Sequence, residues 1–254
     1  MVKLLWLLLS AALGLWLRRP KTPVEGAERM HLLCRGIVEM LGIECRVMGE
    51  LPVSGAVIAN HLSYMDILLM SATRPFVMVA KSEVRSWPLF GWLTSMAGTV
   101  YVERGGGPAT YPAVNAAMAE AYRSGLPVLF FPEGTTTDGG EVLPFRRGLF
   151  HSVLNEGVAL RVAAIRYAVT DAGASVEQDV CWWGDMDLLP HLLRFVRLRG
   201  VRAEIQFGDE VLARRDRFEL SETARTRVVE MYEGLGGGVR AVELGYETEL
   251  VEAL

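Results

Sequence analysis

Short apolar runs alternate with stretches of helical periodicity along most of the chain. The runs predict strands at 55–59, 76–80, 98–103, 127–131, 161–169 and 201–207. The periodic stretches predict helices at 28–42, 64–73, 87–96, 108–124, 146–156, 185–198 and 216–234. Because the predicted strands lack polar alternation and are separated by helices, they indicate an α/β fold. Its central sheet is expected to be mostly parallel, with helices on both faces.

The first predicted helix, 28–42, is amphipathic, and Gly42 is placed to end it. At the other end of the chain, the run GLGGG at 234–238 predicts a flexible break before a short acidic tail. We therefore expect three parts: residues 1–50 with a membrane anchor and the amphipathic helix, an α/β domain at 51–235, and a flexible tail at 236–254.

The amino-terminal segment carries 14 uncharged residues between Lys3 and Arg18, LLWLLLSAALGLWL. As a helix it would be roughly 21 Å long, shorter than the ~30 Å hydrocarbon core of a bilayer. Trp6 and Trp16 resemble interfacial anchors, and RRPKTPVEG is a poor cleavage site for a signal peptide. We expect an uncleaved anchor that either spans the membrane or enters one leaflet, with the remaining chain in the cytoplasm. A signal peptide and a core helix are the alternatives.

Composition narrows the class of protein. A chain of 254 residues can form one sizeable α/β domain. The net charge of −4 gives no reason to expect a nucleic-acid partner. Three scattered cysteines without CxxC spacing argue against a disulfide framework. The zinc-protease motif HExxH and the phosphate-binding motif GxxxxGK[ST] are both absent.

The first candidate site follows the strand at 55–59, where the chain reads ANHLSYMDI. On one continuous helix, His61 and Asp66 would point about 140° apart. If His61 lies in the turn and Asp66 in the first helical turn, the carboxylate can fold back to the imidazole. It would then fix the ring tautomer and raise its basicity, so that His61 could take a proton from a hydroxyl. The alternative is that Asn60, Ser63 and Asp66 are cap residues and His61 is structural.

Two further stretches place polar groups at strand ends. In FFPEGTTTDG, Glu133 and Gly134 begin a turn in which Gly134 allows close approach to a ligand. The hydroxyl and amide groups of Thr135 and the next two threonines could bind oxyanions. In GTVYVERGGG, Arg104 ends a strand and could bind phosphate. Taken singly, these are also ordinary turn residues and a surface arginine.

Together, NHxxxxD, the strand-end arginine and FPEGT resemble the glycerolipid acyltransferase superfamily, specifically its 1-acylglycerol-3-phosphate and lysophospholipid acyltransferases. The segments at 80–104 and 143–150 are similar to that family as well, and the resemblance covers roughly residues 40–170. One departure is Val162, which stands where the family's fourth block usually has proline. That block is thought to line the acyl pocket, so the preferred acyl chain is left open.

The resemblance implies a role for each matching residue. His61 would be the general base and Asp66 would orient it. The acceptor's phosphate would be bound by Arg104 and the loop of Glu133, Gly134 and Thr135, with Lys81 as a further cation. Arg146 and Arg147 would contact the phosphate of the acceptor or of the donor. It also implies that no metal or cofactor takes part, with acyl-CoA or an acyl-carrier-protein (ACP) thioester as co-substrate. Glu133 is an anion, so it is expected to hold Arg104 or a hydroxyl rather than phosphate.

The expected reaction is transfer of a fatty acyl group to lysophosphatidate, giving phosphatidate in phospholipid synthesis at the cytoplasmic face of the membrane. The alternative acceptor is another lysolipid, such as lyso-ornithine lipid, a branch to which the segment CWWGDMDLLPHL at 181–192 looks similar. Two other classes compete with this interpretation. A hydrolase would use Ser63, although no GxSxG motif is present, and a non-catalytic membrane module would not need His61.

Overall fold

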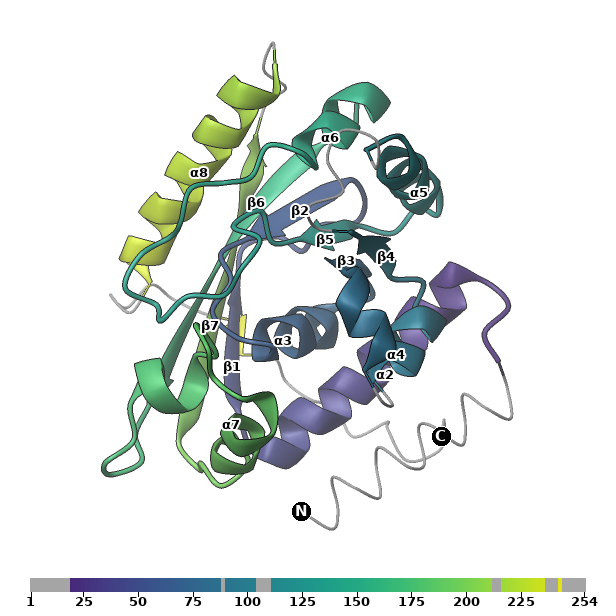
Figure 1. The fold of residues 1–254 in the computed structure, drawn as a ribbon. Coiled ribbons are helices and arrows are strands. Elements are labelled where there is room, and N and C mark those ends of the chain that lie inside the picture. The colour runs from purple at the N-terminus through teal and green to yellow at the C-terminus, as the bar shows by residue number, and fades with distance from the viewer. Residues whose placement is uncertain (1–18, 88–89, 104–110, 212–215, 236–241, 244–254) are drawn as a thin grey trace.

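The computed structural model describes residues 19–87, 90–103, 111–211, 216–235 and 242–243 (Figure 1). The predicted membrane anchor falls within 1–18 and so lies outside the described residues. In the part of the chain that is described, no helix has both the length and the apolar character needed to cross a membrane.

The core of the fold is an eight-stranded sheet with the order β4-β3-β5-β2-β6-β7-β1-β8. Five of its neighbouring pairs are parallel, and only β6–β7 and β1–β8 are antiparallel. The predicted mostly parallel α/β sheet is therefore confirmed. The strands are β1 (Glu44–Met48), β2 (Ala56–Ala59), β3 (Val77–Lys81), β4 (Val100–Val102), β5 (Val128–Phe130), β6 (Leu160–Val169), β7 (Val201–Val211) and β8 (Val242–Glu243).

Helices cover both faces of this sheet (Figure 1). Side chains of β2 alternate between the faces, with Val57 and Ala59 in one core cluster and Ala56 and Ile58 in the other. The first cluster contains residues of α2 (Pro23–Leu41), α3 (Met65–Thr73) and α7 (Leu188–Phe195). The second contains residues of α5 (Tyr111–Arg123), α6 (Phe150–Glu156) and α8 (Arg217–Gly234).

Helix α2 shows both of its boundary signals. Thr22 caps its first turn by accepting a hydrogen bond from the amide of Glu25, and Pro23 occupies the first turn. Its start is therefore earlier than the predicted residue 28. At the other end, Gly42 has φ of 67° and ends the helix, as predicted.

Several predicted helices begin a few residues later than expected. The one at 87–96 begins at Phe90 as α4 (Phe90–Met96), and a 3-10 helix, η1 (Ser82–Ser86), lies before it. Trp87 is extended because it precedes a proline. The one predicted from residue 146 begins at Phe150, since the amide of Arg146 donates to the carbonyl of Pro132 instead of entering a helix.

The sheet also contains strands that the apolar runs did not indicate. Strand β1 pairs in parallel with β7, and the short β8 pairs with β1 at the sheet edge. A short π-helix, η3 (Val176–Val180), was also not predicted. The division of the chain at residues 50 and 235 stays a prediction.

Asn60 joins the end of β2 to the long strand β6. Its Nδ2 donates to the carbonyl of Ile165 at 2.9 Å, and its Oδ1 accepts from the amide of Ile165 at 2.8 Å. The residue is 1% exposed, so water cannot replace these bonds. It thereby fixes the position at which the chain leaves the sheet toward His61.

We expect Asn60→Ala to lower the free energy of unfolding by about 3 kcal/mol, because it leaves two buried backbone groups of Ile165 without partners. Urea unfolding followed by circular dichroism measures the change. Asn155→Ala, at an exposed position of α6, is the control and should change stability by less than about 0.5 kcal/mol. Equal stability of the two variants would contradict the bridging role.

Candidate active site

His61 and Asp66 are in direct contact. The Nδ1 of His61 donates to Oδ2 of Asp66 at 2.7 Å. The Asp66 side chain is fully buried, while 17% of the His61 side chain is exposed. The proton on Nδ1 leaves Nε2 as the basic nitrogen, an assignment that follows from the acceptor character of the carboxylate.

The contact forms because the chain turns sharply where β2 ends. Asp66 lies in the first turn of α3, and its Oδ2 also accepts from the amides of Leu62 and Ser63 at 2.6 and 2.9 Å. The loop is thus wrapped around the carboxylate, which brings residues five positions apart together. Asp66 is thus a first-turn residue of α3 and also the partner of His61, while the role of His61 as a base stays a prediction.

Tyr167 is a site residue that sequence reasoning missed. Its hydroxyl donates to Oδ1 of Asp66 at 2.6 Å, from the middle of β6. Burial and the Asp66 charge raise the pKa of Tyr167 well above its ordinary value, so it stays a donor. A tyrosine in an apolar strand gives no sequence signal of this role, because Tyr167 is 101 positions away from its partner.

The imidazole is also held by stacking. The ring of Phe131, at the end of β5, lies parallel to it at a centroid distance of 4.0 Å and an angle of 11°. By contrast, Ser63 is 0% exposed. A serine without access to a substrate cannot serve as a nucleophile, which argues against the hydrolase alternative.

The carboxylate of Glu133 binds backbone amides of the site and is not directed toward an open cavity. Its Oε1 accepts from the amide of His61 and its Oε2 from the amide of Leu143, both at 2.7 Å. It is 3% exposed. Burial, and to a smaller extent the nearby Asp66 charge, raise the pKa of Glu133 to about 7, although the two amides oppose this. The contacts thus connect the loop after β5 to the turn that carries His61.

Gly134 and Arg146 lie against each other. Gly134 has φ of 70°, and a Cβ at this position would lie 2.7 Å from Cδ of Arg146. The Nε of Arg146 donates to the carbonyl of Glu133 at 3.3 Å. Thr135 is exposed beside them. The structure therefore brings Arg146 to the loop of Glu133, Gly134 and Thr135.

The remaining predicted binding residues are placed differently. Lys81 is exposed at the end of β3, which is separated from β2 by β5. Arg104 lies outside the described residues. Among the residues that the structure does describe, no three His, Cys, Asp or Glu side chains gather as metal ligands would.

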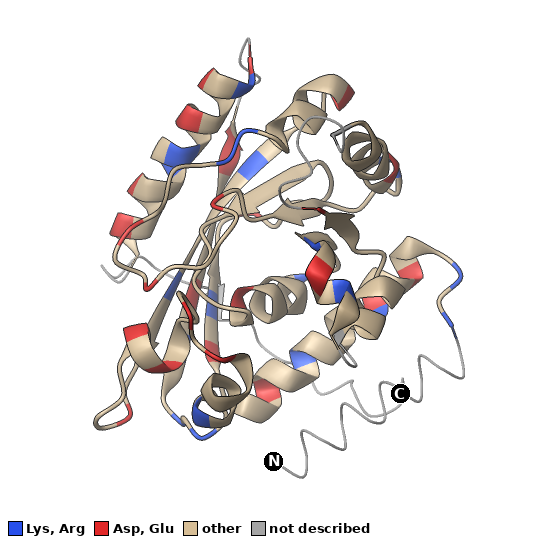
Figure 2. Cartoon of the chain, viewed as in Figure 1, with Lys and Arg blue, Asp and Glu red and all other residues tan. Residues whose placement is uncertain are grey.

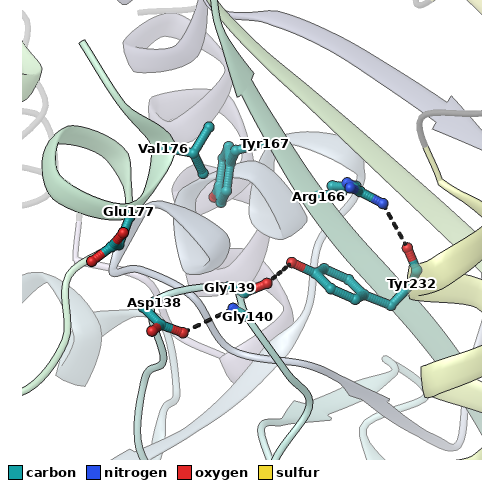
Figure 3. A pocket seen from close by; sticks show the side chains of 8 residues that line it. All are labelled: Asp138, Gly139, Gly140, Arg166, Tyr167, Val176, Glu177 and Tyr232. Atoms are coloured by element: carbon teal, nitrogen blue, oxygen red, sulfur yellow. Dashed lines mark hydrogen bonds between the residues drawn. The ribbon is translucent and has the colours of Figure 1, made fainter.

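A cavity of about 330 Å³ lies behind Tyr167 (Figure 3). It is lined by Asp138 and Glu177 on one side and by Arg166 and Tyr232 on the other. The Arg166 guanidinium donates to the carbonyls of Tyr232 and Leu235 at 3.3 and 2.7 Å. The cavity is close to the turn that carries His61. Thr137, which precedes the lining residue Asp138, donates its amide to the carbonyl of His61 at 3.0 Å.

Glu133→Gln tests the buried carboxyl through the pH dependence of stability. Its pKa is about 7 in the folded state against 4.5 for an ordinary glutamate, so the folded state binds more protons between about pH 4.5 and 7. The contribution of Glu133 to the free energy of unfolding should therefore fall with rising pH across this window. This residue contributes about 3 kcal/mol to the fall, and the variant should lack that component.

Urea unfolding at four pH values across the window measures the two curves. The control is Glu141→Gln, at an exposed position of the same loop, which should follow wild type. Parallel curves for wild type and Glu133→Gln would show that the carboxyl has an ordinary pKa.

Comparison with known proteins identifies the family. A family model described as Acyltransferase matches residues 43–165. The chain is 39% identical over 193 residues to the lyso-ornithine lipid O-acyltransferase of Pseudomonas aeruginosa, covering 74% of this chain and 72% of that protein. It is 34% identical over 178 residues to the 1-acyl-sn-glycerol-3-phosphate acyltransferase of Neisseria meningitidis, covering 69% and 68%.

The fold has a solved counterpart as well. The crystal structure of the 1-acyl-sn-glycerophosphate acyltransferase of Thermotoga maritima superimposes with a TM-score of 0.58. The match covers 91% of this chain and 95% of that one, at 17% identity. Together with the family model and the two relatives, it leads to one conclusion: the chain belongs to the glycerolipid acyltransferase family.

Proposed function

We propose that the protein transfers a fatty acyl group from an acyl thioester to the free hydroxyl of a lysolipid. The observation that carries this proposal is the partly exposed His61, whose Nδ1 is held by the buried Asp66 carboxylate at 2.7 Å. Such a histidine presents Nε2 as a base. Membership of the acyltransferase family supplies the reaction class.

The proposed reaction takes place in two steps. Nε2 of His61 removes the proton of the acceptor hydroxyl while its oxygen attacks the thioester carbonyl, and the imidazolium is stabilised by Asp66. The tetrahedral intermediate then collapses, the C–S bond breaks, and the imidazolium returns the proton to the leaving thiolate. An ester and a free thiol are formed without a covalent acyl-enzyme, and Ser63 takes no part.

His61→Ala removes the base, and we expect the rate of acyl transfer to fall about 10²- to 10⁴-fold. Transfer from radiolabelled oleoyl-CoA or oleoyl-ACP to lysolipid, in detergent, measures it. Asp66→Asn should lose a large part of the rate too, since the carboxylate orients the ring. His151→Ala, at an exposed position of α6, is the control.

Full activity of folded His61→Ala would contradict the catalytic assignment and favour a non-catalytic membrane-binding module. Circular dichroism of each variant separates loss of catalysis from loss of fold.

For the acceptor, we propose lyso-ornithine lipid. A relative of that name shares 39% identity with this chain, and a second, from Rhodobacter capsulatus, shares 33% over 212 residues. An ornithine that is acylated at its α-amine keeps a side-chain ammonium and a carboxylate. The lining of the cavity in Figure 3 contains side chains of both signs, with Asp138 and Glu177 on one side and Arg166 on the other.

Asp138→Asn should raise the KM for lyso-ornithine lipid several-fold, because a carboxylate near the ammonium is lost. The KM for 1-acylglycerol-3-phosphate should not rise, since an anionic head group gains nothing from Asp138. Steady-state kinetics with both acceptors measures the difference. Asp185→Asn, at an exposed position, is the control. Equal changes for the two acceptors would remove the cavity from acceptor selection.

The second candidate acceptor is 1-acylglycerol-3-phosphate, which would give phosphatidate. The Neisseria relative carries that name, and Arg146 beside the Glu133–Thr135 loop could bind its phosphate. We place either reaction at the cytoplasmic face of the membrane. This placement is supported by the apolar amino-terminal sequence with its basic cluster and by Leu189 of α7, which is 65% exposed.

A further inference from the structure

A second cavity, of about 380 Å³, adjoins the FPEGT loop, because Arg146 in its lining donates to the carbonyl of Glu133. The segment that leads into α6 forms one wall, and the first turn of α8 forms the other. Figure 1 shows the segment running beside α8, and Arg225 of α8 donates to the carbonyls of Val142 and Leu143. We call this cavity the arginine pocket; it is lined by Phe145, Arg146, Arg147, Gly148, Arg217 and Phe218.

The charge of this pocket is strongly positive and locally uncompensated. Of the described residues, no carboxylate lies within ion-pair distance of the guanidinium groups of Arg146, Arg147 or Arg217. The neighbouring Asp216 uses its carboxylate to cap α8, accepting from the amides of Phe218 and Glu219. Three arginines that form no ion pair with a described carboxylate suit a phosphate ligand, since guanidinium groups bind phosphate oxygens in a bidentate manner.

The ring of Phe218 contacts two of the three arginines. The Arg147 guanidinium lies 4.7 Å from the centroid of the Phe218 ring, and that of Arg217 lies 5.3 Å from it. Phe218 is itself 51% exposed, so one part of its ring is open to solvent beside the two guanidinium groups. Both cations are therefore held within cation–π distance of one ring.

The arginine pocket is connected to the catalytic turn through two short contacts. Arg146 donates to the carbonyl of Glu133, and the carboxylate of Glu133 accepts from the amide of His61. A ligand in this pocket would therefore lie next to the FPEGT loop, which also contacts the backbone of His61. A long substrate with its reactive group at His61 and its anionic group at a distance fits this arrangement.

We propose that the arginine pocket binds the phosphate at the end of the phosphopantetheine arm of the thioester donor. This inference rests on the proposed function. Both CoA and ACP carry the thioester on that arm, and 13 bonds separate its sulfur from its phosphorus, about 15 Å when extended. The proposed acceptor, lyso-ornithine lipid, has no phosphate, so the donor is the substrate that requires such a pocket.

The test uses the Arg147→Ala/Arg217→Ala double variant of the full chain and three oleoyl thioesters. Oleoyl-CoA and oleoyl-ACP contain the phosphate, whereas S-oleoyl-pantetheine lacks it. We expect the KM for at least one phosphorylated donor to rise tenfold or more, with kcat little changed. The KM for oleoyl-pantetheine should be the same in wild type and variant. The donor affected shows whether the phosphate comes from CoA or from ACP.

Arg227→Ala is the matched control, because Arg227 is an exposed arginine of the same helix and pairs with Glu230 instead of lining the pocket. It should leave the KM of every donor unchanged. Unchanged KM values for both phosphorylated donors in the double variant would overturn the inference. Equal rises for all three thioesters would also overturn it, because the effect would then be independent of phosphate.

Binding separates this inference from the proposed function. Equilibrium dialysis with CoA and with phosphopantetheinylated ACP needs no turnover. Binding by wild type and at least tenfold weaker binding by the double variant would support the pocket even if no acyl transfer were found. Absence of binding of both probes to wild type would overturn it.

Discussion

The site depends on one buried charge. Asp66 is completely removed from water, and a carboxylate in that position is tolerated only when hydrogen bonds replace its hydration. Four donors do so: the ring of His61, the hydroxyl of Tyr167 and the amides of Leu62 and Ser63. These donors come from the turn after β2 and from β6. Satisfying Asp66 therefore fixes the ring of His61, the start of α3 and the position of β6 relative to them.

Glu133 provides a second support for the same turn. It accepts the amide of His61 and ties it to Leu143, in a loop that also carries Arg146. Because Glu133 is buried and its pKa is raised to about 7, the loop keeps its carboxyl near the balance between two charge states. The position of the FPEGT loop is thereby coupled to the position of His61. Glu133 itself is buried and cannot contact a substrate.

The two cavities divide the charges of the molecule in a way that suits two different substrates. Figure 2 shows acidic and basic residues spread over most elements of the fold, so overall charge does not distinguish the two ends of the site. The charged residues that line the arginine pocket are, however, all arginines, while the lining of the cavity behind Tyr167 contains both acidic and basic residues. Val162, at the position of the family's proline, is not among the residues that line either cavity. It is 2% exposed and belongs to the core cluster that includes residues of α8. The structure thus gives it a packing role.

Sequence alone determined the sheet class, six of the strands and the family, because uniform apolar runs and the spacing of NHxxxxD and FPEGT are local signals. It also identified His61 and Asp66, since the turn between them is local.

Sequence did not indicate β1, which is short and gains its place by pairing with β7, 158 positions away at Glu44 and Arg202. Tyr167, Asn60 and the role of Glu133 were likewise decided by tertiary structure, as each acts on a backbone or carboxylate group that lies at least 70 positions distant in the chain. The arginine pocket is a further case: its two walls meet only because α8 packs beside the segment before α6. No periodicity or motif can encode such meetings, because they result from the packing of elements that are far apart in sequence.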